Sequence, residues 1–275
     1  MNINYTKMHG LKNDFIIIDS RIEKVSLNTK IIKKIADRKK GIGCDQVVIL
    51  QKPKKKSASA FIKFYNSDGS HTKACGNAAR CVAFLLMKEF KTKKTILETE
   101  STLLNASLIN KDNVSVDIGK AYFNWKQIPI KKKTNISKIN FNVNSYFKPV
   151  LINVGNPHIV FFIKNLNKLN IKKIGPKIEK NSLFPERINV NFAKILNNNN
   201  IKLKVWERGA GITKACGTGA SATTVAAIKN KLINKRTCYI HMPGGKLKIE
   251  YKKNGHIVMT GPIKIIKKGI LNKFI

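Results

Sequence analysis

The 275-residue sequence is short of acidic residues, cysteines and long apolar runs, and each shortage excludes a class of protein. No run of about 20 apolar residues could cross a membrane, and the first residues lack the apolar core of a signal peptide. The five cysteines include no Cys-x-x-Cys pair, which argues against a disulfide scaffold, a metal site and a thiol–disulfide redox protein. We therefore expect a cytoplasmic protein with no metal and no membrane partner.

The shortage of acidic residues leaves a net charge of +38, from 53 basic and 15 acidic side chains. This charge favours a basic nucleic-acid-binding protein, which stays open as one alternative. However, the basic residues are nearly all lysines spread along the whole chain, whereas a phosphate-binding surface more often uses arginine with interleaved aromatics. We expect a solvated basic surface and no specific nucleic-acid partner.

The chain contains two nearly matching stretches, Ala74-Cys75-Gly76-Asn77 and Ala215-Cys216-Gly217-Thr218. Each runs into a segment that is small or apolar on almost every face, which predicts a buried helix. A cysteine at a helix N-terminus faces unpaired N–H groups and the positive end of the helix dipole, which stabilise a thiolate. The same N–H groups can hold a carboxylate.

Polar residues in equivalent turns repeat at a nearly constant offset. Asn13 and Asn156, like Gln46 and Asn189, lie 143 positions apart; Asn66 and Glu207, like Cys75 and Cys216, lie 141 apart. A period of this length indicates two similar domains. Related by an approximate two-fold axis, they would place the two cysteines on opposite sides of one cleft.

Periodicity also predicts individual elements. Apolar spacing predicts helices around Thr29–Arg38 and Leu169–Lys180, and alternation predicts short strands in both halves. Gly155-Asn156-Pro157-His158 is expected to be a turn, and Lys131–Asn135 a surface loop near the crossover between the domains.

Two cysteines on opposite faces of a carbon atom can invert its configuration. A thiolate removes the proton beside a carboxylate, and a thiol returns one to the other face. Helix N–H groups stabilise the charge that develops on the carboxylate. This chemistry needs no cofactor.

Seven motifs together resemble diaminopimelate epimerase over nearly the whole chain. They are His9-Gly10-Leu11-x-Asn13-Asp14-Phe15, Asp45-Gln46, Asn66-x-Asp68-Gly69-Ser70, Ala74-Cys75-Gly76-Asn77, Gly155-Asn156-Pro157-His158, Glu207-Arg208-Gly209-Ala210-Gly211 and Ala215-Cys216-Gly217-Thr218-Gly219. The resemblance implies a homodimeric, cofactor-independent isomerase that interconverts LL- and meso-2,6-diaminopimelate, for lysine and peptidoglycan precursors. It implies an α+β fold of two similar pseudo-symmetric domains, residues 1–118 with 263–275 and residues 119–262. Each is a curved mixed sheet around a central buried helix, with the active site in the cleft between them.

The resemblance also assigns roles to residues. Cys75 and Cys216 would be the acid/base pair, and His158 and Glu207 would set the protonation of the thiols, without indicating which serves which cysteine. The implied substrate-binding residues are Asn13, Gln46, Asn66, Gly76, Asn77, Asn156, Asn189, Glu207, Arg208, Gly217 and Thr218.

Other assignments remain possible for some of these residues and for the whole chain. Cys44, Cys81 and Cys238 are interpreted as packing residues, and His158 could be a structural turn histidine. A related cofactor-free racemase of the proline racemase type would use the same cysteine pair on another substrate.

Overall fold

The computed structural model describes residues 3–23, 25–72, 75–133, 135 and 139–271. It divides into two compact units, Met1–Asp117 with Thr260–Ile275 and Ile118–Met259. The expected divisions after Ile118 and Pro262 fall one and three residues later. Ala74 of the first cysteine motif and Thr134 of the expected surface loop lie outside the described residues.

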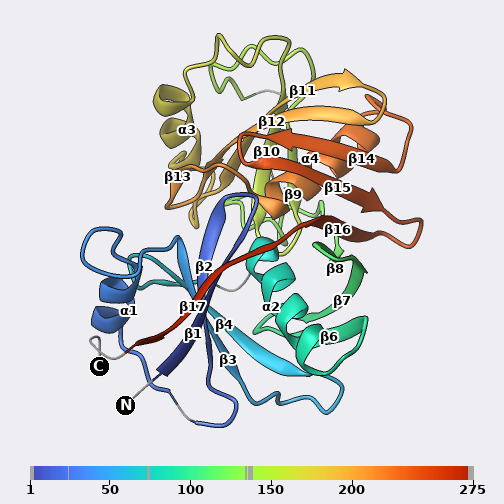
Figure 1. The fold of residues 1–275 in the computed structure, drawn as a ribbon. Coiled ribbons are helices and arrows are strands. Elements are labelled where there is room, and N and C mark those ends of the chain that lie inside the picture. The colour runs from blue at the N-terminus through green and yellow to red at the C-terminus, as the bar shows by residue number, and fades with distance from the viewer. Residues whose placement is uncertain (1–2, 24, 73–74, 134, 136–138, 272–275) are drawn as a thin grey trace. The chain divides into compact units, whose positions relative to one another are not determined.

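The first unit combines two helices with a mixed sheet (Figure 1). The helices are α1 (Thr29–Ala36) and α2 (Gly76–Glu89). The strands are β1 (Ile3–Gly10), β2 (Asn13–Asp19), β3 (Gln46–Gln51), β4 (Ala60–Asn66), β5 (His71–Thr72), β6 (Lys94–Glu98), β7 (Leu103–Asn110), β8 (Asn113–Lys120) and β17 (Lys264–Leu271).

The second unit has the same order of elements. Its helices are α3 (Ile171–Glu179) and α4 (Gly217–Lys229). Its strands are β9 (Val150–Asn153), β10 (Pro157–Phe162), β11 (Asn189–Asn197), β12 (Asn200–Glu207), β13 (Gly211–Ile212), β14 (Thr237–Met242) and β15 (Gly245–Tyr251), and β16 (His256–Pro262) continues past the end of the unit.

Strand pairing repeats between the units. In the first, β2 and β3 are parallel, β3 and β4 antiparallel, and β4 and β6 parallel. In the second, the corresponding pairs β10 and β11, β11 and β12, and β12 and β14 have the same directions. Phe15 pairs with Gln46, and His158 pairs with Asn189, so the 143-residue offset holds within the registers. The expected α+β fold of two similar domains is confirmed.

Each unit encloses one helix that follows its cysteine. All residues of α4 from Gly217 to Ala227 are buried, and so is most of α2, including Asn77–Ala83. Figure 1 shows α2 beside β6 and β7, and α4 beside β14 and β15. These helices are buried because neither sequence offers a polar face to solvent. Apolar clusters also include residues of α1 in the first unit and of α3 in the second.

The strand β10 was missed by the sequence analysis. The stretch Pro157–Phe162 is buried at every position, so it shows no alternation of apolar and polar residues. His158 therefore lies in a buried strand, and its interpretation as a turn histidine is wrong. The turn itself is shorter than expected and precedes Pro157.

Among the described residues, none of the helices is long and apolar enough to span a membrane.

Candidate active site

Cys75 is the N-cap residue of α2. Its backbone is extended, and its Sγ accepts a hydrogen bond from the amide of Ala78 at 3.5 Å. The thiol is only partly buried. The expected position at the start of a buried helix is confirmed, and it places Cys75 among the N–H groups of the first turn, which have no intrahelical acceptor.

A chain of side-chain amides runs from α2 to the start of β2. Asn77 donates through Nδ2 to Asn13 Oδ1 at 3.3 Å, and Asn13 donates through Nδ2 to Asp45 Oδ2 at 2.8 Å. Asp45 is in turn bound by Arg38 at 2.6 Å. Two of the predicted substrate-binding residues, Asn13 and Asn77, are thus in contact with each other.

Gln46 and Asn66 form a second pair in the same unit. They face each other across β3 and β4, and Gln46 Nε2 donates to Asn66 Oδ1 at 2.9 Å. Asn66 Nδ2 donates to Ser70 Oγ at 3.0 Å. Gln46 Oε1 is buried and has no hydrogen-bond partner among the described residues, so it can accept a hydrogen bond from a ligand.

Cys216 occupies the matching position in the second unit. It is the N-cap residue of α4, and its Sγ accepts from the amide of Gly219 at 3.4 Å. Thr218 Oγ1 lies 3.4 Å from the same sulfur. Unlike Cys75, Cys216 is buried, with 4% of its surface exposed.

Glu207 at the end of β12 faces Cys216. Burial, and then the Glu207 carboxylate, raise the pKa of the Cys216 thiol well above its ordinary value. Thr213 donates a short hydrogen bond to Glu207 Oε1, which holds the carboxylate in place. The sequence left open which cysteine Glu207 serves, and this contact links it to Cys216.

His158 is a fully buried, neutral side chain. Burial, and then the charge of Arg208, lower its pKa to about 3. Asn191 Nδ2 donates to His158 Nδ1 at 3.0 Å, so the ring proton is on Nε2, which donates to Asn156 Oδ1 at 2.8 Å. His158 thus fixes the amide of Asn156, another predicted substrate-binding residue.

Arg208 lies in the turn after β12, and its side chain is exposed. Its backbone amide donates to Asn189 Oδ1 at 3.0 Å, and Asn189 Nδ2 donates to the carbonyl of Pro157 at 2.9 Å. The guanidinium donates through Nη1 to the carbonyl of Glu186 at 2.9 Å. Because that partner is uncharged, the Arg208 cation can still bind a carboxylate.

Glu179, at the end of α3, anchors this turn. Its buried carboxylate accepts from Trp206 Nε1 at 2.7 Å and from the amide of Gly209 at 2.9 Å. These two residues flank Glu207 and Arg208 in the sequence. Glu179 was missed by the sequence analysis because it belongs to none of the seven motifs and its partners come from a different element.

We expect Glu179→Ala to weaken substrate binding. The loss leaves two partly buried donors, Trp206 Nε1 and the Gly209 amide, without their acceptor, and we expect it to lower the free energy of unfolding by about 1 kcal/mol. The freed turn no longer holds Arg208, so KM should rise more than kcat falls. Steady-state kinetics and urea unfolding measure both effects.

Glu186→Ala is the matched control, because Glu186 is exposed and only its backbone carbonyl contacts Arg208. A folded Glu179→Ala variant with the parent KM would show that this anchor does not matter for binding.

The structure therefore gathers the predicted residues into two groups, one in each unit. Asn13, Gln46, Asn66, Gly76 and Asn77 accompany Cys75, and Asn156, His158, Asn189, Glu207, Arg208, Gly217 and Thr218 accompany Cys216. Asn191, Thr213 and Arg80 were missed. Among the described residues, no three His, Cys, Asp or Glu side chains are placed to hold a metal ion.

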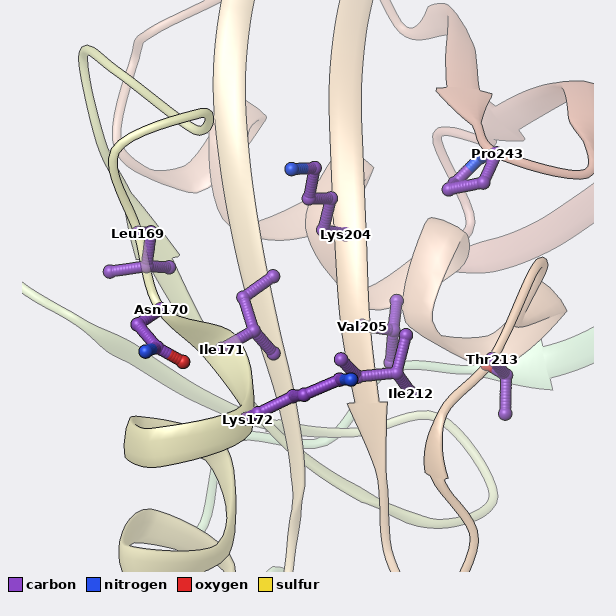
Figure 2. A pocket seen from close by; sticks show the side chains of 9 residues that line it. All are labelled: Leu169, Asn170, Ile171, Lys172, Lys204, Val205, Ile212, Thr213 and Pro243. Carbon is purple, nitrogen blue, oxygen red and sulfur yellow. The ribbon is translucent and has the colours of Figure 1, made fainter.

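Two cavities are lined by neither cysteine. One of about 410 Å³ is bounded by α3, β12 and the β13 segment, and Figure 2 shows Lys172 extending toward Val205 and Ile212. Its wall includes Thr213, the donor to Glu207. The other, of about 570 Å³, lies in the first unit around Tyr5 and Arg21. The position of the candidate site is set by the helix N-termini, and not by these cavities.

Comparison with known proteins identifies close relatives. A family model described as diaminopimelate epimerase matches residues 5–124 and 150–266. The chain is 46% identical over 272 residues to a diaminopimelate epimerase of Pelagibacter ubique strain HTCC1062, covering 97% of this chain and 98% of that protein. It is 40% identical over 269 residues to a diaminopimelate epimerase of Rhodospirillum centenum, and this match covers 98% of this chain and 92% of that protein.

Solved structures share the fold at much lower identity. A hydroxyproline epimerase from Agrobacterium vitis superposes with a TM-score of 0.69 at 13% identity, covering 98% of this chain and 92% of that one. A PhzF-family phenazine biosynthesis protein from Bacillus anthracis gives a TM-score of 0.69 at 12% identity, covering 98% and 99%. At these identities the similarity establishes the fold alone.

Proposed function

The chain belongs to the diaminopimelate epimerase family, and from that premise we propose how its residues perform the reaction. The protein is an isomerase that interconverts LL- and meso-2,6-diaminopimelate. The observation that carries the mechanism is the matched placement of Cys75 and Cys216 as N-caps of the two buried helices. The racemase alternative is less well supported, because the proteins with 38–46% identity are named diaminopimelate epimerases.

In the forward direction, one cysteine acts as a thiolate and removes the proton from the α-carbon. The electron pair left on that carbon delocalises into its carboxylate. The other cysteine, as a thiol, donates its proton to the opposite face, so one proton is taken and one returned. The roles of the two cysteines are exchanged in the reverse direction.

The helix N-termini stabilise the charge that develops in this step. The amides of Gly76 and Asn77 in α2, and of Gly217 and Thr218 in α4, belong to first helical turns. We propose that they bind the carboxylate of the reacting centre, where preorganised N–H donors lower the barrier. No cofactor takes part in this scheme.

The remaining residues select the substrate. Arg208 binds the carboxylate at the distant end, and Gln46 Oε1 accepts a hydrogen bond from an ammonium group. Asn13, Asn66, Asn156 and Asn189 supply further amide contacts. Glu207 sets the protonation of Cys216, and His158 acts through Asn156.

We further propose that the protein is a cytoplasmic homodimer in the pathway to lysine and peptidoglycan precursors. The proposed activity supports the pathway assignment, and the resemblance to the family supports the dimer. The high positive charge is assigned to a solvated surface with only weak, salt-sensitive affinity for polyanions.

The test is incubation of the purified protein with LL-diaminopimelate, followed by chiral analysis of the product. We expect conversion to the meso isomer, also after exhaustive dialysis against a chelator. Activity on proline in place of diaminopimelate would favour the racemase alternative. Activity that requires added pyridoxal phosphate or metal would contradict the cofactor-independent mechanism.

A further inference from the structure

Arg80 is a fully buried arginine in the interior of α2, two turns from solvent-exposed Lys88 on the same helix. A cation is costly to bury unless groups around it use its charge. Burial lowers the pKa of the Arg80 guanidinium to about 10, so the group is still charged at neutral pH. The motifs did not single out this residue.

Arg80 begins the amide chain described above. Its Nη2 donates to Asn77 Oδ1 at 3.1 Å, and Asn77 and Asn13 then carry the chain to the Asp45 carboxylate. A cation at one end and a carboxylate at the other allow only one orientation of each amide. Arg80 therefore fixes the orientation of both Asn77 and Asn13.

Gly10 in β1 leaves room for the guanidinium. A Cβ at that position would lie 3.0 Å from Arg80 Nη2. This contact brings Arg80 against the strand that leads into Asn13, so its position is set by β1 as well as by its own helix.

Cys75 is the anion that this cation can stabilise. The charge interactions of Arg80 include those with Cys81 and Cys75. Burial raises the pKa of the Cys81 thiol to about 12, so Cys81 stays protonated at neutral pH. Cys75 is only partly buried and lies at the helix N-terminus, where a thiolate is favoured.

The other charged groups of the neighbouring strands are engaged elsewhere. Asp14 at the start of β2 pairs with Lys7 of β1 and with Arg38, and Arg38 also pairs with Asp45. On the β1 and β17 side, burial and then the charge of Lys264 lower the pKa of His9, and Asp14 raises it by less.

The second unit has the opposite arrangement of charge. At the 141-residue offset, Arg80 corresponds to Ser221, a buried neutral residue whose hydroxyl donates to the carbonyl of Gly217 at 3.0 Å. At the same offset, Asn66 corresponds to Glu207, the carboxylate that faces Cys216. A buried cation thus accompanies Cys75, and an anion accompanies Cys216.

We propose that Arg80 is a positioning residue that stabilises the thiolate of Cys75, so that in the resting protein Cys75 is the base and Cys216 the acid. This inference rests on the proposed catalytic role of the two cysteines. Arg80 then has a second role, which is to orient the side chains of Asn77 and Asn13 toward the substrate.

The experiment is alkylation of the full chain by iodoacetamide over a range of pH, with Cys75 and Cys216 quantified separately by peptide mapping. The midpoint of each rate profile gives the pKa of that thiol, and it does not depend on how accessible the sulfur is. In the parent protein we expect the Cys75 midpoint to lie below that of Cys216. A Cys75 midpoint equal to or above it would overturn the proposal without any variant.

Arg80→Met should raise the Cys75 midpoint by about one pH unit, which makes alkylation about tenfold slower at neutral pH. The Cys216 midpoint should not move. Arg80→Lys keeps the cation, so the Cys75 midpoint should stay near that of the parent, while KM rises because an ammonium cannot hold Asn77 in the same geometry. The control is Lys88→Met, which removes an exposed cation from the same helix.

A merely structural Arg80 would give less stable variants whose Cys75 midpoint is unchanged, and this result would also overturn the proposal. If Arg80→Met does not fold, the parent profile still decides, because a Cys75 midpoint at or above that of Cys216 overturns the proposal. The proposed function is tested separately. If the parent protein shows the expected midpoints but does not epimerise diaminopimelate, the charge asymmetry between the two cysteines stands and the proposed reaction is wrong.

Discussion

Cys75→Ser and Cys216→Ser each reduce epimerisation by about 10²–10⁴-fold or more, which is the range that a positioned acid or base contributes. A serine hydroxyl ionises far above the range of a cysteine thiol, so it cannot act as an efficient base. Because each cysteine serves one face of the α-carbon, the loss of either stops the full reaction. Chiral analysis of the product from LL-diaminopimelate measures the effect.

Cys238→Ser is the matched control. Cys238 is buried, as Cys216 is, but it lies in β14 and caps no helix. We expect it to cost some stability and to keep the parent rate. A single-base enzyme would lose activity with only one of Cys75 and Cys216, and near-parent activity in either variant would contradict the mechanism.

Arg208→Lys is expected to reduce kcat/KM by about 30-fold, equivalent to about 2 kcal/mol. We expect a free-energy loss at the low end of the usual range for breaking a charge pair, because Arg208 is exposed in the absence of substrate. Lysine keeps the charge but loses the planar fork that binds both oxygens of a carboxylate. Steady-state kinetics with both isomers of the substrate measure the change.

Arg236→Lys provides the control on this prediction. Arg236 is also an exposed arginine of the second unit, and it donates to the carbonyls of Tyr251 and Lys252. We expect its kinetics to match the parent. Normal kinetics in Arg208→Lys would remove Arg208 from the substrate-binding residues.

The repeat was the feature that made the fold predictable from the sequence. The nearly constant offset between matching residues of the two halves implied two similar domains, and the pairing of Phe15 with Gln46 recurs in the pairing of His158 with Asn189. The lack of a polar face in the segments after each cysteine correctly predicted buried helices. The strand β10 escaped because a fully buried strand shows no period of two.

Residues that act through other residues were harder to predict. Three such contacts are Asn191 with His158, Thr213 with Glu207, and Glu179 with the Arg208 turn. In each of them the two partners come from different elements of the chain. A sequence shows such contacts only when the pairing of strands is known. Arg80 was hidden for a related reason, since a charged residue in an apolar helix gives no indication of which group its charge serves.

The central claim is that two cysteines act on opposite faces of one carbon, and deuterium exchange in heavy water tests it most directly. Each isomer is incubated with Cys75→Ser or Cys216→Ser, and loss of the α-proton is followed by NMR. The account predicts that each variant still exchanges the α-proton of the one isomer that faces its remaining cysteine, with opposite preferences in the two variants. Exchange of the same isomer by both variants would contradict the two-base mechanism.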